Sequence, residues 1–248
     1  SEIANLADDI RQPYVGEAAF AHKGGAHVDG VMKVARSFEH MDPALVGNAR
    51  DFIVSNQSGS SLIWDKIREL APNVDRRSPE VAAILAEVKR KEGQGSHFEL
   101  ADASFQLLAS RHLGLFRDSF EFLGFKSVEE RGEDGSLKSE FRLKLKVGDQ
   151  VEETSALGNG PVDAMNAALL KSLVRFFPAL ESLELIDFKV RVLDNAKGTG
   201  ATVRVWTRYV DHAHPDQEPY GTIGVSTNII EASWQALMDG VHYKLMRG

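Results

Sequence analysis

The sequence predicts an α+β protein in which a small helical subdomain is followed by a duplicated βββα domain. Three observations lead to this fold class. Residues 58–118 carry apolar side chains at helical spacing. After residue 119 the pattern changes to an alternation of apolar and charged side chains, and the order strand, strand, strand, helix then occurs twice before residue 248. Two copies of this length do not make a solenoid, so we expect one duplicated domain with pseudo-two-fold symmetry.

Residues 1–57 precede these regular patterns and are predicted to be an irregular accessory segment. Their turn-forming residues come at short intervals, and no periodicity is sustained between them. These residues are Pro13, Gly16, Gly24, Gly25, Gly30, Pro43 and Gly47. Such a segment would make a poor independent domain.

Three helices are expected in the helical subdomain, residues 58–118. The first covers about residues 61–70 and stops before Pro72. The second has Ser78 as its N-cap and Pro79 at its first position, and it continues to Gly93. The third covers about residues 100–113, with Phe105 and Leu108 turned inward.

The first βββα unit is predicted over residues 119–181. Its strongest signal is an alternation of apolar and charged residues from Glu140 to Val147, which is typical of a half-buried strand. A hairpin turn at residues 132–135 connects it to a strand near residues 126–130, and residues 151–156 supply a third strand. The helix then begins at Pro161, after Gly158-Asn159-Gly160.

The second βββα unit, residues 182–248, repeats this order. Alternation over residues 186–192 predicts its first strand, and two further strands follow around residues 203–205 and 220–225. Thr227 and Asn228 are placed to cap a final helix with Trp234 on its apolar stripe. Each sheet then has one face that a helix can cover.

Composition limits the possible functions. The 248 residues are 43% hydrophobic and 26% charged, as in an average globular protein, and the formal net charge of -7 disfavours sequence-independent nucleic-acid binding. The absence of Cys excludes disulfides and thiolate metal sites and fits a reducing compartment. No apolar stretch is long enough to span a bilayer, and residues 1–10 do not resemble a signal peptide. We therefore expect a cytoplasmic protein with neither nucleic acid nor membrane as a partner.

The densest polar cluster lies at residues 22–30. His22, His27 and Asp29 occur there among three glycines, a combination that can supply a general base with close backbone access to a substrate. A polar turn with a hydrogen-bonded histidine explains the same pattern. The irregular setting favours function slightly, because loops carry sites.

Other polar features are weaker signals. His212 and His214 have the spacing of a metal pair, but a solvated loop explains them better. The helix starts at Gly160 and Thr227 could bind an anion or be ordinary caps, and the sequence leaves both interpretations open. Five basic residues could meet an acidic substrate or be scattered surface charges, namely Arg11, Lys33, Arg36, Arg76 and Arg77. The aromatic side chains Trp206, Tyr220 and Trp234 are expected in the core or a dimer interface.

Several strings resemble one enzyme family. QPYVGEAAFAHKGGAHVDG (residues 12–30), FEHMDP (38–43), VGN (46–48), GNGP (158–161) and IIEASWQAL (229–237) are similar to the region after the catalytic barrel in 2-isopropylmalate synthases and citramalate synthases. The matches follow the family's order over nearly the whole chain. The amino-acid sequence at residues 22–25 and 226–234 looks most like that of the citramalate synthase branch.

The resemblance implies a parent acyltransferase that condenses acetyl-CoA with a 2-oxo acid, pyruvate in citramalate synthases, on a metal-bearing (β/α)8 barrel. By motif match, His27 occupies the position of the family's catalytic histidine, and Phe38 occupies a position where relatives often carry a tyrosine. No segment resembles the barrel. We therefore expect a C-terminal fragment that is inactive alone, with no cofactor of its own and the divalent metal left to the barrel, its partner domain.

The resemblance also implies a homodimer whose duplicated domain binds isoleucine or leucine as an effector. By motif position, the effector pocket would include Gly160, Leu185, Phe188, Val192, Thr227 and Ile229. Three alternatives remain open beside an isoleucine-regulated citramalate synthase fragment. They are a leucine-regulated 2-isopropylmalate synthase, a stand-alone amino-acid-binding module and a purely structural dimerisation domain.

Overall fold

The computed structural model describes residues 12–16 and 18–248, and the chain divides into two compact units, residues 1–93 and 94–248. Arg11, one of the five basic candidates, lies outside the described residues, as does the start of the predicted accessory segment. No helix in the described part of the chain is long and apolar enough to cross a membrane.

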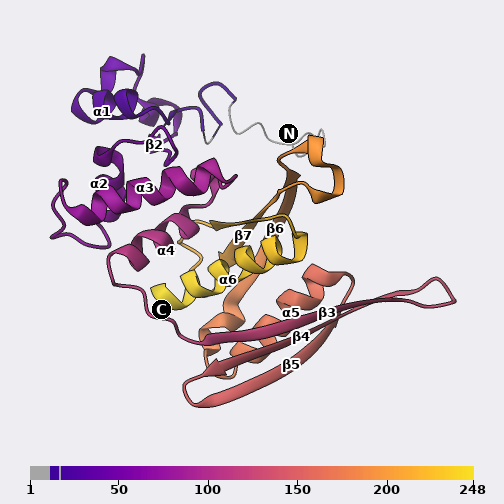
Figure 1. The fold of residues 1–248 in the computed structure, drawn as a ribbon. Helices are drawn as coiled ribbons and strands as arrows, with labels where there is room; N and C mark the ends of the chain where they lie inside the picture. The colour runs from indigo at the N-terminus through magenta and orange to yellow at the C-terminus, as the bar shows by residue number, and fades with distance from the viewer. Residues whose placement is uncertain (1–11, 17) are drawn as a thin grey trace. The chain divides into compact units, whose positions relative to one another are not determined.

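The described residues of the first unit form three helices and one short parallel strand pair (Figure 1). Its elements are β1 (Ala21–His22), α1 (Gly25–Lys33), β2 (Asp51–Phe52), α2 (Ser60–Ile67) and α3 (Pro79–Gly93), with 3-10 turns at Ala35–Ser37 and Pro43–Val46. Pro79 begins α3 and the Ser78 hydroxyl accepts a hydrogen bond from the amide of Val81, so the predicted N-cap is confirmed.

The prediction that residues 1–57 are irregular was wrong for α1. This nine-residue helix contains two glycines, which weaken its propensity, and it still forms because Val28 and Val31 are buried. Burial of one apolar face therefore decides this helix, as is usual for short helices.

The second unit contains the predicted duplication. Its elements are a 3-10 turn (Phe98–Leu100), α4 (Asp102–His112), β3 (Glu121–Arg131), β4 (Leu137–Val147), β5 (Gln150–Gly158), α5 (Pro161–Leu173), a 3-10 turn (Pro178–Ser182), β6 (Leu183–Val192), a 3-10 segment (Asn195–Gly200), β7 (Val203–Asp211), β8 (Tyr220–Ser226) and α6 (Ile229–Arg247). The strands form two antiparallel sheets with the orders β3-β4-β5 and β6-β7-β8. The order βββα therefore occurs twice, as predicted.

Each sheet is covered on one face by the helix that follows it. Helix α5 contacts β4 and β5, and α6 contacts β7 and β8 (Figure 1). On β4, Phe141, Leu143 and Leu145 are fully buried while Arg142 and Lys144 are exposed, so the predicted alternation is confirmed. One hydrophobic core joins α5, α6 and both sheets.

Helix α4 differs from the prediction in its partners. It was expected to share a helical subdomain, residues 58–118, with α2 and α3, but it belongs to the second compact unit and contacts α6 and β8. The Ser104 hydroxyl accepts from the amide of Ile223 at 3.0 Å and donates to Asp239 at 2.6 Å. These side-chain partners lie more than 100 residues away, so helical periodicity could not place α4.

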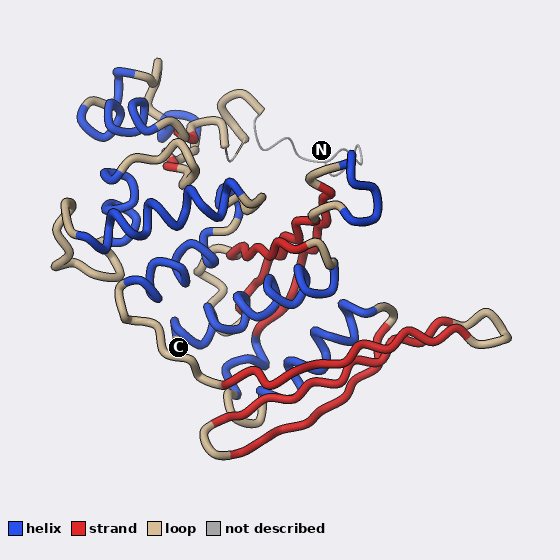
Figure 2. Tube along the Cα trace, viewed as in Figure 1, coloured by secondary structure: helices blue, strands red, loops and turns tan. Residues whose placement is uncertain are grey.

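The β3–β4 hairpin extends beyond the third strand of its sheet (Figure 2). Pairing between β3 and β4 continues to Arg131 and Leu137, whereas β5 ends where Gly158 pairs with Ser139. The first strand is accordingly longer than the predicted residues 126–130.

Candidate functional site

In the first unit, the structure brings together His27, which the resemblance places at the family's catalytic histidine, and Phe38, which lies where relatives often carry a tyrosine. His27 lies in the first turn of α1 and is exposed, and Phe38 follows the 3-10 turn Ala35–Ser37. Their rings stack with centroids 4.2 Å apart and planes inclined by 16°. The Phe38 ring therefore covers one face of the imidazole.

Gly30 makes room for this stack. A Cβ atom at this position would lie 2.6 Å from Cε2 of Phe38, which is closer than two carbon atoms can approach. Any larger residue would push the Phe38 ring away from His27. The glycine of the sequence motif thus serves the geometry of the pair.

Behind Phe38, a buried carboxylate anchors the segment. Glu39 is only 7% exposed and accepts two hydrogen bonds from Arg50, at 2.6 Å from Nε and 2.5 Å from Nη2. Its Oε1 also lies 2.9 Å from Nε2 of His22. The Arg50 guanidinium, with help from His22, holds the pKa of Glu39 below its usual range, so Glu39 is anionic at neutral pH.

The two histidines of the motif therefore have different roles. His22 is half-buried and tied to Glu39, whereas the exposed His27 ring touches Phe38. Glu39 and Arg50 were missed by the sequence reasoning. They lie 17 and 28 positions beyond His22, and no spacing rule connects residues so far apart.

Asp29, the third polar residue of the motif, turns toward other partners. Its carboxylate accepts from Lys33 at 2.6 Å and from the Ser61 hydroxyl at 3.4 Å. The hydrogen bond from Lys33 is the main cause that lowers the pKa of Asp29. This carboxylate joins α1 to α2, and these contacts give it no place beside the imidazole of His27.

In the second unit, three of the predicted effector residues lie at one end of the second sheet. Val192 pairs with Val203, and Val203 pairs with Ser226, which precedes Thr227 and the start of α6. Two strand spacings, about 10 Å, therefore separate β6 from β8 at this end. Val192, Thr227 and Ile229 are all exposed there.

The other predicted effector residues are placed differently. Phe188 packs against Val205 and the small residues Ala232 and Ala236 of α6. Leu185 is seven residues before Val192, roughly 23 Å along the strand, and packs against the main core. Gly160 is the N-cap of α5, in the other βββα unit.

Of the two helix starts that the sequence proposed as anion sites, α6 is capped by a side chain, whereas Gly160, the N-cap of α5, makes no side-chain cap hydrogen bond. At α6, the Asn228 carboxamide accepts hydrogen bonds from the amides of Ile230 and Glu231. At α5, the Asp163 carboxylate accepts from the amide of Asn159 at 2.8 Å. Ordinary capping therefore explains the α6 start, and a carboxylate already lies at the start of α5.

The histidine pair of the β7–β8 loop does not form a metal site. His212 lies 2.5 Å from Glu184 and His214 lies 2.7 Å from Asp211, so each imidazole has a different carboxylate partner. Among the residues that the structure describes, no group of three or more potential ligands could hold a metal ion. Trp234 and Tyr220 are buried, as expected for core aromatics, and Trp206 is half-buried.

Comparison with known proteins agrees with this architecture. Residues 99–245 match the family described as the LeuA allosteric (dimerisation) domain, and residues 14–96 match the homocitrate synthase post-HMGL domain-like family. The boundary between these matches falls near the division of the two compact units. The chain therefore belongs to the LeuA allosteric domain family, within the 2-isopropylmalate synthase and citramalate synthase group.

Within this group the chain is more similar to two (R)-citramalate synthases than to a 2-isopropylmalate synthase. It is 44% identical to the (R)-citramalate synthase of Aquifex aeolicus over 248 residues, which are 100% of this chain and 46% of the relative. Identity to the (R)-citramalate synthase of Geobacter sulfurreducens is also 44%, over 98% of this chain and 46% of the relative. The 2-isopropylmalate synthase of Pseudoalteromonas atlantica is 29% identical over 96% of this chain and 43% of the relative. The chain spans less than half the length of these relatives.

Proposed function

We propose that this chain is the accessory and regulatory part of an acyltransferase that condenses acetyl-CoA with pyruvate to form citramalate. The main support is the difference in identity over nearly the same residues, 44% to two (R)-citramalate synthases and 29% to a 2-isopropylmalate synthase. In this proposal the chain acts in the cytoplasm, as a homodimer, together with a catalytic (β/α)8 barrel. Alone, the chain has no synthase activity.

In the proposed reaction, a base removes a proton from the acetyl methyl group, the carbanion adds to the keto carbon of pyruvate, and water releases CoA. A divalent metal held by the barrel would polarise the keto carbonyl. His27 would complete that site, because its imidazole is exposed and its ring is held by Phe38. Phe38 has no hydroxyl, so proton transfer on this side of the site falls to the imidazole alone.

The second unit would bind the effector, isoleucine. Exposed apolar side chains at the end of β6 and the start of α6, Val192 and Ile229, offer a surface for a branched side chain. Feedback inhibition is then a coupling free energy between this unit and the barrel.

Calorimetric titration of the chain with L-isoleucine and with L-leucine tests the regulatory part. We expect tighter binding of isoleucine and its loss in Val192→Asp. Val151→Asp is the matched control, because Val151 is also an exposed strand valine but lies on β5. Tighter leucine binding would favour a 2-isopropylmalate synthase, and no binding of either amino acid would leave a structural dimerisation domain.

A hybrid enzyme tests the catalytic part. The chain is fused after the N-terminal region of the Aquifex aeolicus relative, and citramalate formation from acetyl-CoA and pyruvate is measured. We expect an active hybrid, no activity from the chain alone, and a loss of about 100-fold or more in kcat for His27→Ala. His112→Ala, at an exposed histidine of α4, is the control. An active His27→Ala hybrid would remove His27 from catalysis, and a hybrid that binds isoleucine without any activity would support a stand-alone amino-acid-binding module.

A further inference from the structure

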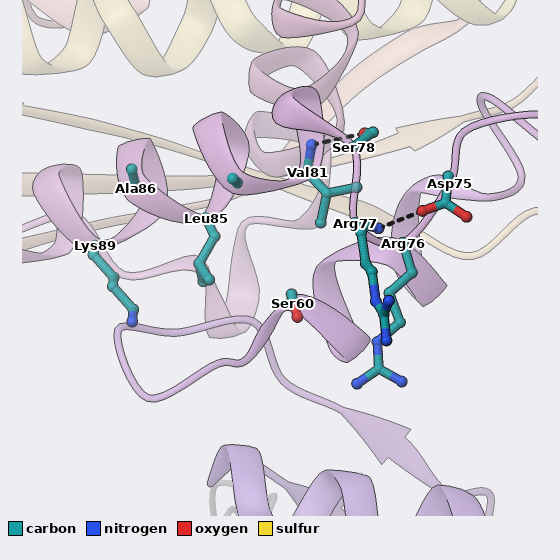
Figure 3. A pocket seen from close by; sticks show the side chains of 10 residues that line it. Ser60, Asp75, Arg76, Arg77, Ser78, Val81, Leu85, Ala86 and Lys89 are labelled. Atoms are coloured by element: carbon teal, nitrogen blue, oxygen red, sulfur yellow. Dashed lines mark hydrogen bonds between the residues drawn. The ribbon is translucent and has the colours of Figure 1, made fainter.

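An open groove of about 830 Å³ runs along α3 in the first unit (Figure 3). One end is formed by the turn before α3, and its floor is formed by α3 itself, from Val81 to Lys89. Neither His27 nor Phe38 contributes to it, so the groove is separate from the candidate catalytic residues.

The groove is rich in positive charge. Arg76, Arg77 and Lys89 line it, and Asp75 is the one carboxylate among the described residues that does. An Oδ1 atom of Asp75 accepts a hydrogen bond from the backbone amide of Arg77 at 2.8 Å, which orients that carboxylate toward the turn. The side chains of Arg76 and Arg77 extend in the same direction (Figure 3).

Among the described residues, two of these cations have no ionic partner. Arg76 donates to the Ser61 hydroxyl and lies 3.9 Å from Asp29. Within the part of the chain that the structure describes, no carboxylate lies within salt-bridge distance of the Arg77 guanidinium or the Lys89 ammonium. Their charges are therefore available to an anion from solution.

Three hydrogen bonds between a side chain and the backbone help to hold the turn that carries the two arginines. The indole of Trp64 donates to the carbonyl of Val74 at 2.8 Å, and Asp75 and Ser78 accept from the amides of Arg77 and Val81. The backbone is thus fixed before a ligand arrives, which lowers the entropy cost of binding.

The floor of the groove is apolar between its charged ends. Leu85 lies half-buried there, flanked by the small exposed residues Ala82 and Ala86. Ser78 and Lys89 are 11 positions apart, about 16 Å along the helix. The volume of the groove is within the range of small-molecule sites.

From this arrangement we propose that the groove binds an organic phosphate. Its phosphate group lies between Arg76 and Arg77, where guanidinium groups can donate paired hydrogen bonds to phosphate oxygens. Its apolar part lies over Leu85, and Lys89 attracts a second anionic group of a longer ligand. The groove thereby adds a small-molecule site to the first unit, which is independent of the proposed amino-acid effector.

Phenyl phosphate and inorganic phosphate are the probes, titrated calorimetrically into the full chain at low salt. We expect phenyl phosphate to bind at least 10-fold more tightly than inorganic phosphate, because only the ester reaches Leu85. Arg77→Ala weakens both probes by 10-fold or more, whereas Leu85→Ser weakens only phenyl phosphate. Circular dichroism verifies that each variant is folded.

Lys91→Ala is the matched control, because Lys91 is a cation on the same helix that does not line the groove. It should leave both affinities unchanged. Equal losses of affinity for Lys91→Ala and Arg77→Ala would show that the probes respond only to the overall charge of the helix. This result would overturn the proposal. Tighter binding of a hexaglutamate peptide than of phenyl phosphate would also overturn it, in favour of an acidic polypeptide partner.

Discussion

The two βββα units of the second compact unit share one topology but use their sheets differently. Both have antiparallel strands in sequence order, and both carry a bulge in the first strand pair, at Phe122–Gly124 and at Leu185–Asp187. In the first sheet, the face opposite α5 presents charged β4 residues such as Arg142 and Lys144 to solvent. The second sheet is covered on the corresponding face.

The cover consists of the segment that leads into α4. The indole of Trp206, on β7, donates to the carbonyl of Leu100, and Arg204 donates to the carbonyl of Gly95 at 2.6 Å. Lys189 lies 4.8 Å above the centre of the Trp206 ring. Duplication therefore fixes the strand order, and the side chains on the outer face decide whether a sheet remains solvated or gains a third layer.

The helices that cover the two sheets, α5 and α6, also differ in the side chains that they bury. The buried residues of α5 are apolar apart from Ser172, whereas α6 buries His242, Tyr243 and Lys244. Lys244 forms a buried ion pair with Asp211 at 2.7 Å. Substitutions in the two βββα units are therefore expected to differ in their effects on stability.

The largest expected effect is at Gly221, on the covered face of β8. A Cβ atom there would lie 1.8 Å from the carbonyl oxygen of Leu100, a backbone atom that cannot move alone. We expect Gly221→Val to lower the free energy of unfolding by about 3 kcal/mol, as in strongly overpacked sites. Urea denaturation followed by circular dichroism measures this.

Ser155→Val is the corresponding control on the first sheet. Ser155 pairs with Arg142 and is exposed, so a larger side chain meets no cover there. Its effect should stay within about 0.5 kcal/mol. Equal effects at Gly221 and Ser155 would show that the cover does not form in solution.

Truncation of Trp206 should have the next largest effect. Trp206→Ala removes half-buried ring surface and the hydrogen bond to Leu100, so we expect a loss of about 2.5 kcal/mol. Arg142→Ala, on the uncovered sheet, should change the unfolding free energy by less than about 0.5 kcal/mol. The same denaturation experiment compares them, and a neutral Trp206→Ala would contradict the difference between the two faces.

The smallest effect concerns pH and the α6 histidine. His242 stacks on Phe120 with ring centroids 4.8 Å apart, and no described residue hydrogen-bonds its Nδ1. Burial lowers the pKa of His242 to about 4, with a further contribution from Arg111 and an opposing one from Asp118. Because the unfolded chain takes up this proton near pH 6.5 and the folded chain does not, stability falls as the pH drops from 6.5 toward 4.

Between pH 7 and pH 5 this histidine should cost about 2 kcal/mol of stability. His242→Phe keeps a ring on Phe120 and removes the titrating group. Between pH 7 and pH 5, the unfolding free energy of this variant should therefore fall by about 2 kcal/mol less than that of the unchanged chain. His112→Phe, at an exposed histidine, should behave like the unchanged protein. Parallel pH profiles for His242→Phe and the unchanged chain would mean that His242 is accessible in the folded state.

Much of this architecture is readable from local sequence. Alternation around Phe141, the glycines before Pro161 and the Asn228 cap predict the duplicated unit because strand periodicity and helix caps depend on neighbours in the chain. Local patterning alone did not separate His27 from His22, and the resemblance to the family singled out His27. Helix α1 was missed because burial, which is set by tertiary contacts, outweighs its weak propensity.

By itself, the sequence determined the order of the elements, the repeat and the position of the catalytic histidine candidate. Only the tertiary structure decided that α4 joins the second unit, that Phe38 stacks on His27, and that Glu39 is clamped by Arg50. The physical reason is the range of the interactions. Backbone periodicity and capping act over a few residues, whereas packing, buried charge and a sheet's second face depend on residues brought together from distant parts of the chain.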